Sequence, residues 1–297
     1  MRILVTGTEG QVVRSLTERA GRLTDVEVVA VGRPALDLAR PEAVAAALDP
    51  VGADVIVNAA AYTAVDQAES EPELADTING AGAGAVAAAA ARRGLPVVQI
   101  STDYVFDGSR ERAYGEEDAT GPVSAYGRSK LAGERAVQAA NANSVVLRTA
   151  WVYSPFGKNF AKTMLRLAGT RDEVAVVDDQ IGAPTSALDI ADAILAVAAQ
   201  LVARPGDDGL RGVFHMSAAG RASWADFAEA IFAASRAAGG PTAQVKRITT
   251  AEFPTPARRP AYSRLDCGKL EVVHGVTLPD WRESVPSVVE RLLAEIR

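Results

Sequence analysis

The feature that most constrains the fold is a buried strand followed at once by a glycine turn and a helix. Residues 2–6 lack polar alternation, which is typical of a strand buried on both faces of a parallel sheet. Gly7 and Gly10 come next, and a helical pattern then runs to Arg22. This order is typical of a turn that cradles a dinucleotide pyrophosphate at a helix N-terminus, although an ordinary strand–helix turn has the same local pattern. Val13 stands where a third glycine usually allows close helix–strand packing.

The strand–helix pattern repeats and predicts the fold class. Further strands are expected at 26–31, 54–57, 96–100 and 144–149, with helical patterns between them. Five strand–helix alternations in about 150 residues predict an α/β fold with a doubly wound, Rossmann-type parallel sheet. The looser second half predicts a smaller C-terminal substrate-binding cap. We expect an NAD(P)-binding domain from residues 1–150 with 187–215, and a smaller substrate-binding domain from residues 151–186 with 216–297.

The residues after the second strand indicate which nicotinamide dinucleotide binds. A carboxylate there hydrogen-bonds the ribose hydroxyls of NAD, whereas an arginine pairs with the 2′-phosphate of NADP. This chain has Gly32-Arg33 and no acidic residue at that point. We therefore expect NADPH to be preferred, with NADH as a possible substitute; an Arg33 that is merely solvated is the alternative. Asp37 and Leu38 are placed to contact the adenine edge.

Small and hydroxyl-bearing residues stand where two central strands end. Residues 58–63 follow the third strand, and their small side chains leave room where open α/β sheets bind ligands. Tight packing beneath a loop explains the alanines equally well. Thr102 ends the fourth strand and can hydrogen-bond a reacting carbonyl oxygen, although Ser or Thr at such a place often only caps a turn.

Tyr126 and Lys130 form the strongest chemical signal in the chain. In a helix expected at 123–141, residues four apart lie on the same face. A neighbouring ammonium favours the phenolate and lowers the pKa of a tyrosine below about 10. Such a tyrosine can protonate the oxyanion that forms when a hydride attacks a carbonyl. Short motifs also arise by chance, but Tyr126 is the only tyrosine with a lysine four residues later.

Several motifs together resemble the dTDP-4-dehydrorhamnose reductase family of extended short-chain dehydrogenases/reductases. The resemblance extends from Met1 to the final helix. The motifs are Gly7-x-x-Gly10, Tyr126-x-x-x-Lys130 and the segments 58–60, 66–72, 101–106, 148–153, 159–164, 179–185 and 254–260. It implies that the C4 ketone of dTDP-4-dehydro-β-L-rhamnose is reduced by NAD(P)H, which is the final step of dTDP-L-rhamnose synthesis.

The resemblance also implies roles for individual residues. Tyr126 resembles the general acid, Lys130 the lysine that holds the nicotinamide ribose, and Thr102 the residue that orients the carbonyl. The expected cofactor-binding residues are Gly7, Glu9, Gly10, Gln11, Val12, Arg33, Asp37, Leu38, Ala59, Ala60, Ala61, Tyr62, Thr63, Tyr126 and Lys130. The expected substrate-binding residues are Thr102, Asp103, Val105, Phe106, Trp151, Asn159, Arg258 and Arg259.

Two departures from the family concern a metal. Some members form dimers around a Mg²⁺ ion held by glutamates, but Arg14-Ser15 and Leu188 stand at the corresponding positions here. They argue against a bridging Mg²⁺ and predict a monomer or a weak homodimer. His215 and His274 stand apart from any cluster of metal-ligating residues in the sequence, so we also expect no catalytic metal.

Charge and cysteine content exclude other classes of protein. A net charge of −6 gives no electrostatic reason to bind nucleic acid or an anionic membrane. A single cysteine, Cys267, has no internal disulfide partner, which favours a reducing compartment. The apolar run at 3–5 is too short for a signal sequence or a membrane span. We expect a cytoplasmic protein.

Three other functions stay open on the sequence alone. The first is a 4-ketoreductase that acts on another dTDP-6-deoxy-4-keto sugar, because a few pocket residues can switch sugar and stereochemistry. The second is a non-catalytic relative that keeps the nucleotide pocket and binds a partner enzyme. The third is an epimerase with permanently held NAD, against which Arg33 argues.

Overall fold

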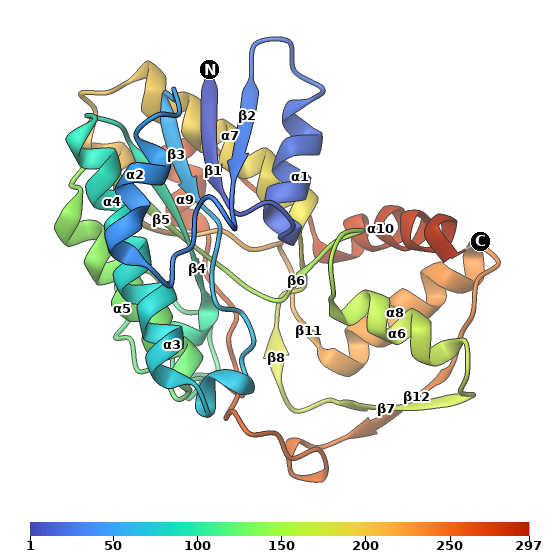
Figure 1. The fold of residues 1–297 in the computed structure, drawn as a ribbon. Helices are drawn as coiled ribbons and strands as arrows, with labels where there is room; N and C mark the ends of the chain where they lie inside the picture. Colours follow the sequence, from blue (N-terminus) through green and yellow to red (C-terminus); the bar gives the residue numbers. More distant parts are fainter. Residues whose placement is uncertain (297) are drawn as a thin grey trace.

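The central element of the computed structural model, which describes residues 1–296, is a six-stranded parallel sheet (Figure 1). Its strand order is β10-β5-β4-β3-β1-β2, and each neighbouring pair is parallel. The strands are β1 (Arg2–Thr6), β2 (Glu27–Val31), β3 (Val55–Asn58), β4 (Val97–Thr102), β5 (Ser144–Thr149) and β10 (Gly212–His215). The predicted doubly wound sheet is confirmed, with β10 as a sixth strand at its edge.

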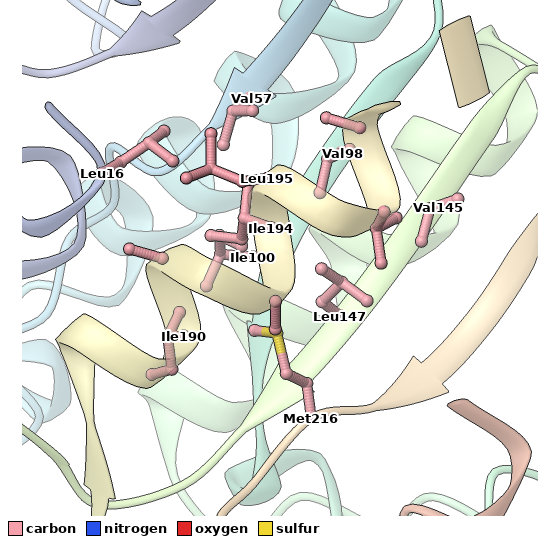
Figure 2. Packing of buried hydrophobic residues seen from close by; sticks show 14 of the residues in the cluster. Leu16, Val57, Val98, Ile100, Val145, Leu147, Ile190, Ile194, Leu195 and Met216 are labelled. Carbon is pink, nitrogen blue, oxygen red and sulfur yellow. The ribbon is translucent and has the colours of Figure 1, made fainter. Parts of the chain in front are cut away.

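Helices cover both faces of this sheet because side chains alternate along each strand. Ile3 and Val5 belong to one buried cluster, while Leu4 between them belongs to another. Figure 2 shows the first cluster, where Ile194 and its helical neighbours lie over strand residues such as Leu147. The first layer contains α1 (Gln11–Ala20), α7 (Ala187–Ala203) and α9 (Gly268–His274), and the second contains α2 (Val44–Leu48), α4 (Ala83–Arg92) and α5 (Ala125–Ala140).

A second lobe has a buried cluster of its own, built on the helices that Figure 1 shows to the right of the sheet. These helices are α6 (Phe160–Ala168), α8 (Trp224–Ala237) and α10 (Trp281–Ile296). Small sheets border them: β6 (Val152–Tyr153) pairs with β9 (Thr185–Ser186), β7 (Glu173–Val177) with β12 (Gln244–Ile248), and β8 (Ile181–Gly182) with β11 (Ala222–Ser223). The chain enters this lobe directly after β5.

The helical stretch between β3 and β4 has three consecutive parts. It begins as α3 (Pro72–Asp76), widens into a π-helical segment, η3 (Thr77–Gly82), and continues as α4. Gly82 lies so close to the main chain of Leu38 that an added Cβ would stand 2.6 Å from its carbonyl oxygen. The remaining short helices are η1 (Pro41–Ala43), η2 (Gln67–Glu69), η4 (Asp103–Val105), η5 (Asp208–Leu210) and η6 (Thr250–Glu252).

Candidate active site

The glycine turn after β1 has the geometry of a phosphate cradle. Gly7 has a φ of 92°, a conformation that favours glycine, and its N–H donates to the Val31 carbonyl over 2.7 Å. Gly10 is the N-cap of α1, and no side chain caps that helix end, so its first N–H groups are available to an anion. Val13, in place of the third glycine, is buried against this turn without obstructing it. The turn therefore fits a dinucleotide pyrophosphate.

A polar network fixes the main chain at the end of β3. The Thr6 hydroxyl donates to Asn58 Oδ1 over 2.6 Å and accepts the N–H groups of Ala59 and Ala60 over 3.1 and 3.0 Å. Asn58 Nδ2 in turn donates to Gln99 Oε1 on β4 over 2.7 Å. Two of the predicted cofactor-binding residues, Ala59 and Ala60, are thus held by bonds to the sheet itself.

Asn79 connects the next cofactor segment to α5. Its Oδ1 accepts the N–H of Tyr62 over 2.8 Å, and its Nδ2 donates to the Tyr62 carbonyl and to Ser129 Oγ over 3.0 and 2.9 Å. Ser129 stands between Tyr126 and Lys130 on the helix. Asn79 was not predicted from the sequence, and its place within a run of small helical residues was the available signal.

The remaining predicted cofactor residues lie around the same turn. Arg33 is exposed directly after β2, where Gly32 lies so close to Gly7 that an added Cβ would stand 3.2 Å from the Gly7 main chain. Asp37 accepts the N–H of Ala39 over 3.0 Å, while the Leu38 side chain is buried in the second layer. Exposed Glu9 and Thr63, and half-exposed Val12 and Ala61, complete the set.

Gln11, at the first position of α1, joins the glycine turn to the second lobe. Its side-chain oxygen accepts the Ser154 hydroxyl over 2.8 Å, and its Nε2 donates to the Val152 carbonyl over 3.5 Å. A residue predicted to contact the cofactor therefore also bonds to the segment that leaves the sheet.

Helix α5 presses its N-terminal turn against the end of β4. Ser124 caps the helix by accepting the N–H of Gly127 over 3.1 Å. Gly127 leaves no room for a side chain, because an added Cβ would collide with the Tyr104 carbonyl. The glycine after Tyr126 is therefore a packing requirement, and it brings the Tyr126–Lys130 turn next to η4.

Tyr126 lies beside Thr102 and Asp103, so the structure brings these predicted residues together. The Thr102 hydroxyl donates to Asp103 Oδ1 over 2.9 Å and accepts the N–H of Tyr104 over 3.2 Å. Burial raises the pKa of Tyr126, the Thr102 hydroxyl opposes that change, and the Asp103 charge adds to it. Burial likewise raises the pKa of Asp103 to about 6. The rings of Tyr104 and Tyr126 meet edge-on at 5.5 Å.

Lys130 is buried one helical turn later, at 5% exposure. Its ammonium donates to the Ile100 carbonyl on β4 over 2.7 Å. Burial lowers its pKa to about 8, although the negative charge of Glu134 acts in the opposite direction and raises it. The predicted lowering of the Tyr126 pKa by Lys130 is wrong for this structure: the pKa of Tyr126 is raised because desolvation of the phenol dominates.

A buried ion pair lies beneath these groups and was not predicted. Glu134 accepts Arg148 Nε and Nη2 over 2.9 and 2.7 Å, with the two side chains 2% and 5% exposed. Glu134 also accepts the Ser101 hydroxyl over 2.5 Å. Burial and the Arg148 charge lower the pKa of His215 to about 3, so this histidine is neutral at physiological pH. The pair ties α5 to β5 under Lys130.

The predicted substrate residues separate into two groups. The Val105 and Phe106 side chains are fully buried, and Phe106 stacks on Tyr114 at 4.2 Å, so these side chains pack the site from below. Asn159 is the N-cap of α6 and donates to the Ser154 carbonyl over 2.8 Å. The side chains of Val105, Phe106 and Asn159 therefore have packing or capping roles within the protein.

Trp151 and the arginine loop lie closer to solvent. Trp151 follows β5, is half-exposed, and stacks on Trp224. Arg258 is exposed, whereas Arg259 pairs with Asp66 over 2.8 Å and so connects the loop at 254–260 to the segment after β3.

Other features of the described residues do not indicate a metal site or a membrane span, and the surface hollow found lies away from the candidate site. No group of three or more His, Cys, Asp or Glu side chains in residues 1–296 is arranged to hold a metal ion. Within the same range, no helix combines the length and hydropathy needed to cross a membrane. A surface hollow of about 600 Å³ beside Cys267 contains none of the predicted catalytic residues. The candidate site is therefore defined by its chemistry and not by this hollow.

A parallel α/β sheet with a glycine turn at a helix N-terminus defines the class of Rossmann-type dinucleotide-binding folds, and Thr102, Tyr126 and Lys130 lie at the end of its central strand β4. Comparison with known proteins narrows this class. The RmlD substrate binding domain family matches residues 1–294. The dTDP-4-dehydrorhamnose reductase of Sinorhizobium fredii is 52% identical over 295 residues, which covers 99% of both chains.

Solved structures agree with the sequence comparison. A dTDP-4-dehydrorhamnose reductase from Clostridium acetobutylicum has a TM-score of 0.90 at 40% identity, covering 99% of this chain and 100% of that one. One from Bacillus anthracis, in complex with NADP, has a TM-score of 0.88 at 35% identity and covers 99% of each chain. The chain belongs to the dTDP-4-dehydrorhamnose reductase family.

Proposed function

We propose that this protein is an NADPH-dependent oxidoreductase that reduces the C4 ketone of dTDP-4-dehydro-β-L-rhamnose to give dTDP-L-rhamnose. The observation that carries the proposal is the grouping of Thr102, Tyr126 and Lys130 at the end of β4, in a chain that matches dTDP-4-dehydrorhamnose reductases over nearly its full length. An exposed Arg33, and Gly32-Arg33 with no acidic residue directly after β2, support NADPH over NADH.

The chain's own residues suggest how the proton is handled. Burial keeps the Tyr126 phenol protonated at neutral pH, so its hydroxyl is in the form that donates. We propose that this hydroxyl gives its proton to the C4 oxygen while the Thr102 hydroxyl hydrogen-bonds the same atom. With a pKa of about 8, Lys130 is mostly charged at neutral pH, which stabilises the phenolate that remains.

The glycine turn and its surroundings would hold the dinucleotide. We assign the pyrophosphate to the turn from Gly7 to Val12, and the 2′-phosphate to Arg33. Lys130 would bind the nicotinamide ribose, and the segments 37–38 and 59–63 would line the remainder. When bound, the nicotinamide supplies the hydride. No metal is assigned a role.

The two lobes would divide the ligands. We propose that residues 1–150 with 187–215 bind the dinucleotide, and that residues 151–186 with 216–297 bind the sugar nucleotide. Trp151 would contact the sugar, and Asp103 would contact its polar groups. Arg258 is free to reach the diphosphate, while Arg259, already paired with Asp66, would mainly hold the loop. We further propose a cytoplasmic protein that is a monomer or a weak homodimer.

The test is an assay of NADPH consumption by the purified protein with a panel of dTDP-4-keto-6-deoxysugars. We expect the fastest turnover with dTDP-4-dehydro-β-L-rhamnose and a product identical to dTDP-L-rhamnose. Faster reduction of another sugar in the panel would favour the other ketoreductase. No turnover with tight binding of a partner enzyme would favour a non-catalytic subunit, and NAD that remains bound through purification would favour an epimerase.

A further inference from the structure

Trp151 and Trp224 form a stacked pair at the edge of the second lobe. Their ring centroids lie 3.6 Å apart, and their planes differ by 5°. Trp151 comes directly from the end of β5, whereas Trp224 is the first residue of α8. Both side chains are half-exposed. The pair therefore joins two distant parts of the sequence at the surface of the lobe and not in its core.

The backbone of Trp151 is held in a conformation that bulky residues rarely adopt. Its φ is 45°, and among the described residues no other non-glycine residue has a positive φ. Gly182 lies against the ring, so that an added Cβ would stand 2.5 Å from Trp151 Cε2. Such a conformation persists only when the surroundings determine it, and it is common at ligand sites. The orientation of Trp151 is thus imposed by its neighbours.

Trp224 is itself anchored. Its indole N–H donates to Gln180 Oε1 over 3.2 Å, and the Gln180 amide donates to Thr250 Oγ1 over 2.9 Å. Gln180 is buried, at 5% exposure. The segment 179–185, which carries part of the family resemblance, supplies both the acceptor for Trp224 and the space beside Trp151.

From these contacts we propose that Trp224 is a positioning residue for the sugar: with Gly182 on the other face of the ring, it fixes the orientation of Trp151, whose remaining exposed edge packs against the apolar face of the 6-deoxysugar. This inference rests on the proposed function, in which Trp151 contacts the sugar. Without the stack, the Trp151 indole loses a flat partner on one face and its orientation becomes variable. The affinity for the sugar then falls, while the nucleotide and the dinucleotide bind as before.

The role of Trp224 is tested by equilibrium titration with three ligands: dTDP-L-rhamnose, dTDP alone and NADPH. The titrated proteins are wild type, Trp224→Ala and Trp224→Phe. Loss of an aromatic pair of this kind is expected to weaken binding by about two- to tenfold. In Trp224→Ala we expect this loss of affinity for dTDP-L-rhamnose only. Trp224→Phe keeps a stacking ring and should recover most of the loss. Because Trp224 acts through Trp151, the double variant Trp151→Ala/Trp224→Ala should bind dTDP-L-rhamnose no more weakly than Trp151→Ala.

Gly182→Ala provides an independent variant in case Trp224→Ala folds poorly, which its melting temperature would reveal. The added methyl displaces the Trp151 ring while Trp224 stays, so the same sugar-specific loss is expected. Unchanged affinity for dTDP-L-rhamnose in both variants, an equal loss for dTDP alone, or additive losses in the double variant would overturn the inference. If wild type binds neither dTDP nor dTDP-L-rhamnose, the proposed function fails together with the inference. If wild type turns over normally but the variants give one of these contradicting results, only the role of Trp224 fails.

Discussion

The end of the central sheet and the edge of the second lobe are built by opposite means. The first, here called the floor, consists of Thr102, Tyr126, Lys130 and the buried pair Glu134–Arg148. The second, here called the wall, consists of Trp151, Trp224, Phe160 and Gly182.

The floor depends on polar groups that are satisfied by other protein groups, whereas the wall depends on stacked rings and one polar anchor, the Trp224 N–H to Gln180 bond. Preorganised donors suit charge that develops on an oxygen, and flat apolar surfaces suit the carbon face of a sugar. It follows that floor variants should change rate, protonation and stability, while wall variants should change sugar affinity.

The largest expected effect is on the floor. Tyr126→Phe removes the proton donor but keeps the ring, so kcat should fall by about 10²- to 10⁴-fold with the NADPH affinity unchanged. Steady-state kinetics and NADPH titration measure the two quantities. Tyr104→Phe is the matched control, because Tyr104 meets Tyr126 edge-on but receives no chemical role. A Tyr126→Phe enzyme within tenfold of wild-type kcat contradicts the assignment.

The second effect compares a buried charge with an exposed one. Arg148→Met leaves the Glu134 carboxylate buried and unpaired, so the free energy of unfolding should fall by about 3–5 kcal/mol in urea titrations. Arg247→Met is the control: its pairs with Asp178, Asp226 and Glu229 lie at an arginine that is 40% exposed, and should cost about 1 kcal/mol or less. Equal losses would contradict a special role for the buried Glu134–Arg148 pair in the stability of the floor.

The third effect concerns the loop after β2, which lies outside both regions and is assigned to the dinucleotide. Arg33→Ala should lower the preference for NADPH over NADH in kcat/KM by about tenfold, because a charge-assisted bond to the 2′-phosphate is lost. Arg40→Ala, on an exposed arginine later in the same loop, should leave the ratio unchanged. An unaltered ratio in Arg33→Ala would show that Arg33 is only solvated.

The smallest effect is a pH dependence. With its pKa lowered to about 8, the Lys130 ammonium is present below pH 8 and is lost as the pH rises through that value. The kcat/KM of wild type should therefore fall about threefold between pH 7.5 and 8.5. Lys130→Arg keeps its charge and should lack this fall. A wild-type kcat/KM that stays constant between pH 7.5 and 8.5 would contradict the titration of Lys130 in this interval.

The fold could be predicted where each strand has an unbroken apolar centre between helical patterns, as at 3–5 and 145–147. The second lobe was less predictable. Its two-residue strands are too short to show a periodicity. Strand β12 (Gln244–Ile248) is polar at three of its five positions, which gives no indication that it pairs with β7.

The floor was predictable in part because Tyr126 and Lys130 are four residues apart in one helix, so their proximity is local. The Glu134–Arg148 pair joins a helix to a strand, and a helical glutamate usually faces solvent. Trp224 was missed for a similar reason: its stack with Trp151 depends on how the second lobe folds back onto the end of β5.

The central claim is tested most directly with NADPH that carries deuterium at the transferable position of its nicotinamide. After reaction with dTDP-4-dehydro-β-L-rhamnose, NMR of the sugar nucleotide locates the label. We expect dTDP-L-rhamnose with deuterium at C4 and at no other carbon. A sugar nucleotide without deuterium at C4 would contradict the claim.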